Sequence, residues 1–139
     1  MQDDNQYIKE LIAEGEHQQQ DFKLEISNAR KIAKTLVAFE NTDGGRLLIG
    51  VKDNGRISGI RSEEEYYMID AAAGMYCKPA IPFECFKRTI DGKNILEVII
   101  EASDNKTHYA QDDTGKWLAY HRVEDNNFLA NYILLQVWK

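Results

Sequence analysis

Two acidic residues and a lysine stand close together near the start of the chain, at a spacing that suits phosphodiester chemistry. Glu16 precedes Asp21 by five residues, and a single residue separates Asp21 from Lys23. On an extended strand, residues two apart project from the same face, so Asp21 and Lys23 are predicted to lie side by side. Carboxylates of this kind can hold a divalent cation and orient a water for attack on phosphorus. Asp53, which follows a later apolar run, is the third candidate acid.

The alternative interpretation of these residues is structural. An exposed strand can carry an ion pair between Asp21 and Lys23, and such pairs contribute little to stability. Catalysis is therefore the second interpretation, behind a role in binding alone. A binding module needs no cofactor, whereas a nuclease built on these acids would need Mg²⁺ or Mn²⁺.

Basic residues form a second group, one that could bind phosphates. Residues 23–61 contain eight Lys and Arg against four Asp and Glu, although the whole chain has a net charge of −6. A basic segment within an acidic chain is the pattern expected of a local polyanion site. A solvated helix face would give the same pattern, and the acidic net charge argues against general nucleic-acid binding. The candidate phosphate-binding residues are Lys23, Arg30, Lys31, Lys34, Arg46, Lys52 and Arg122.

A predicted helix over residues 28–41 is the clearest element that must position these groups. Apolar residues recur along it at i, i+3, i+4, i+7 and i+8, which predicts one buried face, and Arg30 and Lys34 fall outside that stripe. Two glycines at 44–45 then end the helix, since glycine adopts a left-handed cap without steric penalty. They do not form a phosphate-binding loop, because that loop follows a strand, precedes a helix and ends in Lys-Ser/Thr.

The remaining pattern predicts an α+β fold with a mixed β-sheet flanked by helices, since hairpins and crossovers both join its elements. The helix over 28–41 allows a parallel crossover between the strands on either side of it. The predicted elements are an N-terminal helix at about 3–14, strands at 18–25, 46–52 and 56–60, a helix from 62 to about 77, hairpin strands at 82–90 and 94–102, a polar loop at 103–115, a strand at 116–123 and a C-terminal helix at about 127–139.

Length and composition predict one domain over residues 1–139, with a core at about 15–123 between the two terminal helices. No apolar run approaches the roughly 20 residues of a membrane helix, and the polar start does not resemble a signal peptide. Two cysteines without metal-ligand spacing are expected to be reduced thiols, so a cytoplasmic location is predicted. The last helix carries apolar residues such as Trp138, which favour either a helix that is cut short or a helix that docks on a partner. A homodimer is one form that such docking can take.

Residues 38–60 carry the pattern AF-x-NT-x-GG-x-L-x-IGV-x-D-x-G-x-I-x-G-I. This pattern resembles the signature of the Schlafen AlbA-type DNA-binding domain, a family also described as divergent AAA ATPases. Asp21-Phe22-Lys23 is similar to the family's Glu-Phe-Lys, and Tyr120-His121-Arg122 is similar to its final Tyr-x-Arg strand. The resemblance covers about residues 14–130.

The resemblance implies a nucleic-acid-binding module that forms part of a transcription regulator, with DNA as the first expectation for its ligand and RNA as the alternative. It also implies a second hypothesis, a metal-dependent nuclease, because some members of the Schlafen family use acidic residues of this kind to cleave RNA. Glu16 and Asp21 fall at the family's Glu-x4-Glu spacing, and Asp53 falls on its Gly-Val-x-Asp acid. Asp21 is one methylene shorter than the usual glutamate, which would displace a metal by about 1.5 Å. A protein-interaction domain, favoured by the acidic charge and the apolar last helix, is the third hypothesis.

Overall fold

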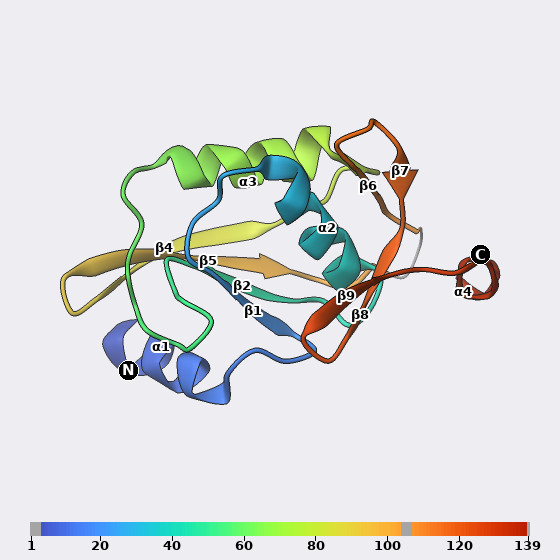
Figure 1. The fold of residues 1–139 in the computed structure, drawn as a ribbon. Coiled ribbons are helices and arrows are strands. Elements are labelled where there is room, and N and C mark those ends of the chain that lie inside the picture. Colours follow the sequence, from blue (N-terminus) through green and yellow to red (C-terminus); the bar gives the residue numbers. More distant parts are fainter. Residues whose placement is uncertain (1–3, 104–106, 139) are drawn as a thin grey trace.

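A four-stranded mixed sheet flanked by helices lies at the centre of the computed structural model, which describes residues 4–103 and 107–138 (Figure 1). The elements are α1 (Asp4–Glu14), β1 (Gln20–Lys23), α2 (Ala29–Glu40), β2 (Gly45–Ile49), α3 (Glu64–Met75), β3 (Cys77–Lys78), β4 (Glu84–Ile90), β5 (Lys93–Ile100), β6 (Tyr109–Gln111), β7 (Trp117–Leu118), β8 (Tyr120–Val123), β9 (Asn126–Leu129) and α4 (Tyr132–Val137). The central strand order is β1-β2-β5-β4, and smaller sheets are formed by β3-β6-β7 and by β8-β9. The predicted α+β class is confirmed.

Strand direction in the central sheet follows from its connections. The helix α2 joins β1 to β2, and these two strands pair in parallel, as the predicted crossover requires. The other two central pairs are antiparallel. The predicted hairpin between β4 and β5 is confirmed, and its turn residues Asp91 and Gly92 have φ angles of 50° and 78°. Two positive φ angles in a two-residue turn match the right-handed twist of the paired strands.

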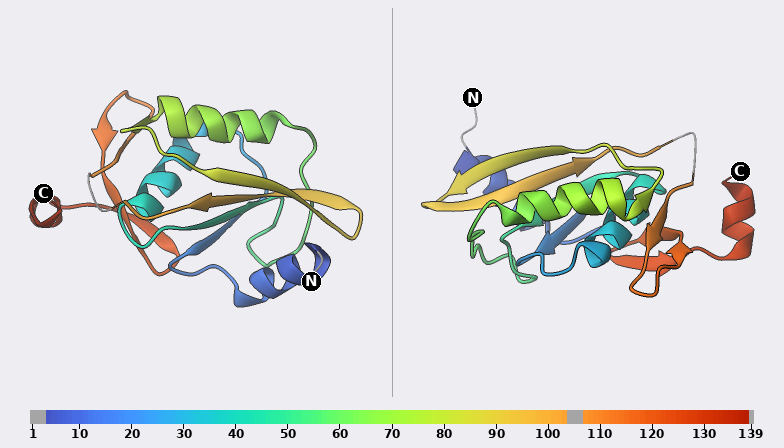
Figure 2. Two further views of the ribbon diagram at one scale, coloured as in Figure 1. Left: turned by 180° about the vertical axis from the view of Figure 1, so that it is seen from behind. Right: turned by 90° about the horizontal axis from the view of Figure 1, so that it is seen from above.

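Helices cover both faces of the central sheet, with α2 and α3 on one face and α1 on the other (Figure 1 and Figure 2). Successive residues of β2 alternate between the two cores. Leu47 and Ile49 pack with α2 and α3, whereas Leu48 packs with Phe22 and Ile8 on the side of α1. The edge strand β1 therefore presents Asp21, the neighbour of Phe22, to the same face as α2.

The boundaries of α2 agree with the predicted helix. The side chain of Asn28 accepts a hydrogen bond from the backbone N–H of Arg30 at 2.9 Å, which satisfies one free donor of the first turn. After the helix, Gly44 has a φ of 74°, and a Cβ at this position would lie 2.7 Å from the carbonyl oxygen of Ile100. A Cβ on Gly45 would meet the ring of Phe39. The glycines therefore serve the helix end and close packing.

Three predicted elements between residues 56 and 123 were wrong in detail. In place of a strand over 56–60 there is a single bridge between Val51 and Ile57. The loop predicted at 103–115 contains β6, which pairs with β3 and β7. The strand predicted at 116–123 is divided into β7 and β8, which belong to different sheets. Strands β6, β7 and β8 contain only three, two and four residues, too few for local alternation to reveal them, and β3, one partner of β6, lies on the other side of the β4-β5 hairpin in the sequence.

The predicted C-terminal helix is also corrected, because its first residues form β9. Strand β9 pairs with β8 across a turn in which Glu124 has a φ of 55°. The side chain of Asn127 faces α2 and donates to Thr35 Oγ1 at 3.0 Å. The helix begins later, where Asn131 accepts a hydrogen bond from the backbone N–H of Leu134 at 2.8 Å. Asp3 and Lys139, at the limits of the predicted terminal helices, lie outside the described residues.

The last helix, α4, stands away from the body of the molecule (Figure 2). Its apolar side chains Tyr132, Ile133 and Val137 are exposed, and the ring of Trp138 lies 6.4 Å from that of His121. Self-association through this helix stays a prediction. Within the described part of the chain, none of the helices combines the length and the apolar character needed to cross a bilayer.

Candidate functional site

The acidic residues predicted from sequence come together at the edge of the central sheet. Glu16 lies in the segment before β1, and its Oε2 accepts a hydrogen bond from the backbone N–H of Phe22 at 3.2 Å. Asp21 lies on β1 with a side chain that is only 6% exposed. Its Oδ2 is 3.5 Å from Nζ of Lys23, which remains 39% exposed. The predicted pairing of Asp21 and Lys23 is present, although Asp21 is buried rather than solvated.

Glu16 and Asp21 interact directly, and the consequence is a shifted proton affinity. Partial burial, a hydrogen bond with Asp21 and the negative charges of Asp21 and Asp53 together raise the pKa of Glu16 to about 7. The hydrogen bond from Phe22 opposes this rise. A carboxyl group with such a pKa holds or releases a proton near neutral pH, which is the property required of a general acid or base.

The fit of this site to a divalent cation is incomplete. Glu16 and Asp21 supply two carboxylates, and Asp53 lies near enough to raise the pKa of Glu16. Among residues 4–103 and 107–138, however, no group of three or more His, Cys, Asp and Glu side chains is placed to hold a metal ion. Mg²⁺ takes six ligands in an octahedron, of which the protein usually supplies one or two carboxylates while waters and substrate phosphates supply the rest. No step through a metal is derived from this arrangement.

Arg122 belongs to the interior of the site rather than to its surface. Its side chain is 1% exposed, and one Nη lies 3.7 Å from Oδ1 of Asp21. The guanidinium donates to the carbonyl oxygens of His17 and Gln20, both at 3.1 Å, and lies 4.9 Å from the ring centre of Phe39. These contacts make Arg122 the residue that ties β8 to β1 and α2. We therefore leave it out of the phosphate-binding surface predicted from sequence.

Arg46 is likewise engaged inside the fold. Its Nε donates to the fully buried carboxylate of Glu97 at 2.8 Å, on the face of the sheet that α1 covers. Arg88 donates to the other oxygen of Glu97 at 3.0 Å. Because the charge of Arg46 is already neutralised by a buried partner, we also leave this residue out of the phosphate-binding surface.

The N-terminal half of α2 keeps its basic residues at the surface. Lys31 and Lys34 are exposed, and together with Arg30 they line a cavity of about 140 Å³ that also borders Tyr120 and the loop after β6. Lys34 Nζ lies 5.0 Å from the ring centre of Tyr120, and the guanidinium of Arg30 lies 4.5 Å from the ring centre of Tyr76. Such cation–π contacts fix the direction of a cation without neutralising its charge.

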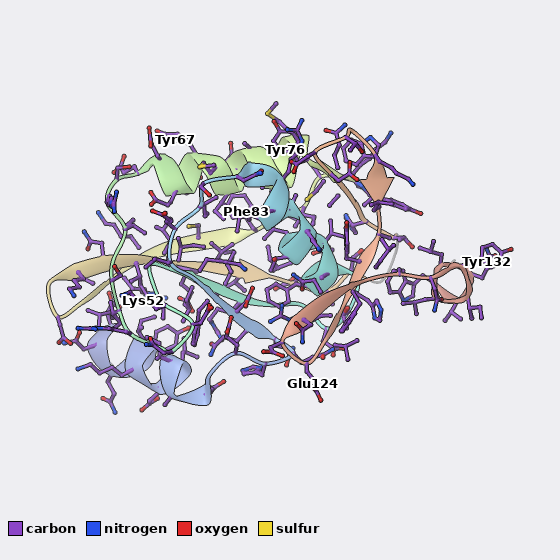
Figure 3. All side chains as sticks on the ribbon, in the orientation of Figure 1. Lys52, Tyr67, Tyr76, Phe83, Glu124 and Tyr132 are labelled. Carbon is purple, nitrogen blue, oxygen red and sulfur yellow. The ribbon has the colours of Figure 1, made fainter. Side chains whose placement is uncertain are left out.

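Lys52 takes part in a separate basic cluster at the turn after β2 (Figure 3). It lines a cavity with Arg56 and Lys93, and Lys93 Nζ donates to the carbonyl oxygen of Ile57 at 3.2 Å. Sequence reasoning had not assigned Lys93 to a site, because it belongs to the hairpin turn between β4 and β5. The structure therefore divides the predicted basic residues into a surface on α2, a cluster at this turn, Lys23 beside Asp21, the half-buried Arg46 and the buried Arg122.

With this geometry established, the chain can be compared with known proteins. The family model described as Schlafen, AlbA_2 matches residues 16–131, which is most of the chain. The chain belongs to this Schlafen AlbA_2 family. The matched range includes the carboxylate pair, the basic face of α2 and Arg122, and it ends just before α4.

Two solved structures share the Schlafen AlbA_2 fold of this chain. One is the crystal structure of the DIP2311 protein of Corynebacterium diphtheriae, with a TM-score of 0.63 and 20% identity. The match covers 87% of this chain but only 23% of that one. The other is the solution structure of the N-terminal domain of a protein of Nitrosomonas europaea named as related to the ATP-dependent DNA helicase RecG, with a TM-score of 0.62 and 24% identity, covering 88% and 89% of the two chains. No curated protein matches the chain.

Sequence reasoning missed the aromatic partners of the basic face. Tyr120 was identified only as part of the Tyr-x-Arg resemblance, and Tyr76 only as part of a helix stripe. The alternation along residues 120–123 could have placed Tyr120 on the same side as Arg122, and hence toward α2. No local signal connects Tyr76 to Arg30, because the two residues come from different helices.

Proposed function

We propose that this Schlafen AlbA_2 domain binds nucleic acid through its phosphates at the basic face of α2. The observation that carries the proposal is a basic cluster on one helix beside a cavity, in which Lys31 and Lys34 are exposed and Arg30 is half-buried. Phosphate oxygens are bound by such point charges, and backbone contacts supply most of the affinity of sequence-independent binding. The family and the name of its helicase-related neighbour support a role associated with nucleic acid.

Two acidic residues limit where the phosphates can lie. Asp112 and Asp113 line the same cavity as the basic residues. The carboxylate of Asp112 is held within its own turn, because it accepts hydrogen bonds from the backbone N–H and hydroxyl of Thr114 and from the backbone N–H of Lys116. These bonds lower the pKa of Asp112, so the group remains charged. The phosphate path is therefore expected to follow α2 through Lys31 and Lys34 rather than cross the loop after β6.

Charge reversal at both lysines is expected to remove most of the binding. In Lys31→Glu/Lys34→Glu, two phosphate contacts are lost and two negative charges face the ligand. We expect affinity at low salt to fall by at least about tenfold and the salt dependence to weaken by about two counterions. Fluorescence anisotropy with labelled single-stranded DNA, duplex DNA and hairpin RNA, titrated at several salt concentrations, measures both quantities.

The matched control is Lys9→Glu/Lys87→Glu, which makes the same change in net charge at exposed positions on α1 and β4. Compared at 0.1 M salt, this variant should bind within about twofold of the unmodified chain, because long-range repulsion is then screened beyond roughly 10 Å. Equal losses in the two variants would show that net charge, and not the α2 face, governs the interaction. Unchanged affinity in the α2 variant would overturn the proposal.

The carboxylate pair favours a second candidate function, cleavage of RNA or single strands. Glu16, with a pKa of about 7, can give a proton to a leaving oxygen or take one from water, and Asp21 lies beside it. Lys23, at 3.5 Å from Asp21 and partly exposed, can neutralise a phosphate oxygen as negative charge develops. Asp53 affects the proton affinity of Glu16.

Cleavage of a labelled hairpin RNA and a labelled single strand is the test of this second function. Glu16→Gln keeps the shape of the side chain but removes its titration, so the rate is expected to fall by about 10²–10⁴-fold. The assay is run with Mg²⁺, with Mn²⁺ and with chelator, and Glu14→Gln serves as a neighbouring control. Cleavage that survives in Glu16→Gln would come from a contaminant and would exclude this pair as the active site.

A further inference from the structure

Another cavity, with a volume of about 480 Å³, lies at the C-terminal end of α2, far along the helix from its basic half. Three glutamates line it: Glu40 from α2, Glu84 from β4 and Glu101 after β5. Phe83, which packs against Tyr66 of α3 with the ring centres 6.3 Å apart, adds an aromatic surface (Figure 3). No Lys or Arg occurs among the described residues that line this cavity.

Glu40 is the unusual member of this group. Its side chain is 6% exposed, and Oε2 makes no hydrogen bond with any described residue. Oε1 lies 3.6 Å from Nε2 of His108. Burial of a carboxylate oxygen without a partner is unfavourable, so a native fold usually compensates it with protein, water or a ligand.

His108 lies beside Glu40 and is oriented by a backbone carbonyl. Its Nδ1 is 3.0 Å from the carbonyl oxygen of Pro79, and a carbonyl can only accept, so Nδ1 carries a hydrogen. Nε2 faces Oε1 of Glu40 at 3.6 Å, which is longer than a hydrogen bond, so His108 does not satisfy the buried carboxylate. Burial and the charge of Glu101 raise the pKa of Glu40 to about 7, which agrees with a proton that is easily displaced.

We propose that this cavity binds an organic cation, an alkylammonium or guanidinium group, with Glu40 as its direct partner and Glu84 and Glu101 at the entrance. The negative end of the α2 dipole adds to the attraction, because Glu40 is the last residue of the helix. The ring of Phe83 offers a face to the cation, and the apolar side chain of Ile99 suits its alkyl part. An organic cation fits better than a metal ion, because no three ligating side chains converge in the described part of the chain. The site is independent of the nucleic-acid surface.

Such a cation can come from a free amine or from a lysine or arginine side chain of another protein. Butylammonium, methylguanidinium and spermidine represent the free source, and an acetylated, amidated Gly-Lys-Gly peptide represents the side chain. Backbone amide shifts of the folded chain, followed by NMR during titration, locate each probe. We expect shifts around Glu40, Phe83 and Glu101; shifts with the amines alone indicate a free ligand, and shifts with the peptide as well indicate a side chain.

Glu40→Gln is expected to weaken binding of whichever probe binds by at least tenfold, and Glu101→Gln, at an exposed position, by a smaller factor. Glu25→Gln, which changes an exposed glutamate on another part of the chain, is the matched control and should leave binding unchanged.

The groups that face Glu40 are His108, Glu101 and Cys77, with Glu84 across the cavity. Because the cation binds the carboxylate form of Glu40, whose pKa is about 7, binding should be tighter at pH 8 than at pH 6. Shifts absent with every probe, or retained in both Glu40→Gln and Glu101→Gln, would overturn the proposal.

Discussion

Replacement of Arg122 by alanine is expected to lower the free energy of unfolding by about 3–5 kcal/mol, the range observed when one partner of a buried ion pair is removed. The guanidinium donates to the carbonyl oxygens of His17 and Gln20 and to Oδ1 of Asn127. It also lies 3.7 Å from Asp21, whose side chain is 6% exposed. Without Arg122, these acceptors lose their donor, and Lys23 is left as the ion-pair partner of Asp21. Urea unfolding followed by circular dichroism measures the loss.

Two further variants separate charge from geometry at this position. Arg122→Lys keeps the charge, but a single ammonium cannot reach acceptors on β1, β9 and the segment before β1, so an intermediate loss is expected. In Arg122→Ala/Asp21→Asn the uncompensated charge is removed, and part of the stability should return. Lys31→Ala, at an exposed position, should stay within about 0.5 kcal/mol of the unmodified chain. A loss below about 1 kcal/mol in Arg122→Ala would show that the buried contacts do not hold β8 in place.

This result also matters for tests of function. Arg122 resembles a phosphate-binding residue in sequence, because it follows the Tyr-x-Arg pattern of the family. If Arg122→Ala fails to bind nucleic acid, the loss can arise from unfolding of the β8-β9 sheet against α2 and β1. Lys31 and Lys34 are the positions at which a loss of binding reports on contact with the ligand, since their side chains are exposed.

Elements with strong local signals could be predicted from sequence. The helix α2 has a capping asparagine, an apolar stripe and a glycine stop, and the β4-β5 hairpin has its Asp-Gly turn. The pairing of Asp21 with Lys23 and the proximity of Glu16 also followed from spacing. What could not be predicted depends on contacts between distant segments. The burial of Arg122 depends on residues about a hundred positions earlier, and β6 pairs with β3, from which the whole β4-β5 hairpin separates it in the sequence.

Glu97 illustrates the same limit on the other face of the sheet. It occupies the middle of β5, where an alternating pattern predicts a solvated polar residue. In the fold it is fully buried under α1, and its carboxylate accepts hydrogen bonds from Arg46, from Arg88 and from the hydroxyl of Tyr7. Sequence alternation identified the correct face of the strand but not the helix that covers it. The cavity beside Glu40 was missed for a related reason, since its residues come from α2, β4 and the end of β5.

Replacement of Glu97 by alanine is the second change expected to have a large effect, a loss of about 3–5 kcal/mol in the free energy of unfolding. The variant removes the acceptor of three hydrogen bonds and leaves two cations close together, both only about a quarter exposed. Arg88 keeps its ion pair with Asp4, at 3.3 Å, but Arg46 loses its ion-pair partner. Urea unfolding gives the total loss, and Tyr7→Phe, which removes a single hydrogen bond, should cost about 1 kcal/mol.

The distribution of this loss within the molecule distinguishes two mechanisms. Tyr7 and Asp4 belong to α1, so the Glu97 network links that helix to β2, β4 and β5. If the network mainly docks the helix, amide hydrogen exchange in Glu97→Ala should accelerate over residues 4–14 under conditions in which β2 and β5 remain protected. If it mainly stabilises the sheet, exchange should rise equally in α1 and in the strands. We expect the first pattern, because Ile8 and Leu11 are the residues of α1 that are buried in the core, and the Glu97 network adds polar anchors to that short apolar stripe.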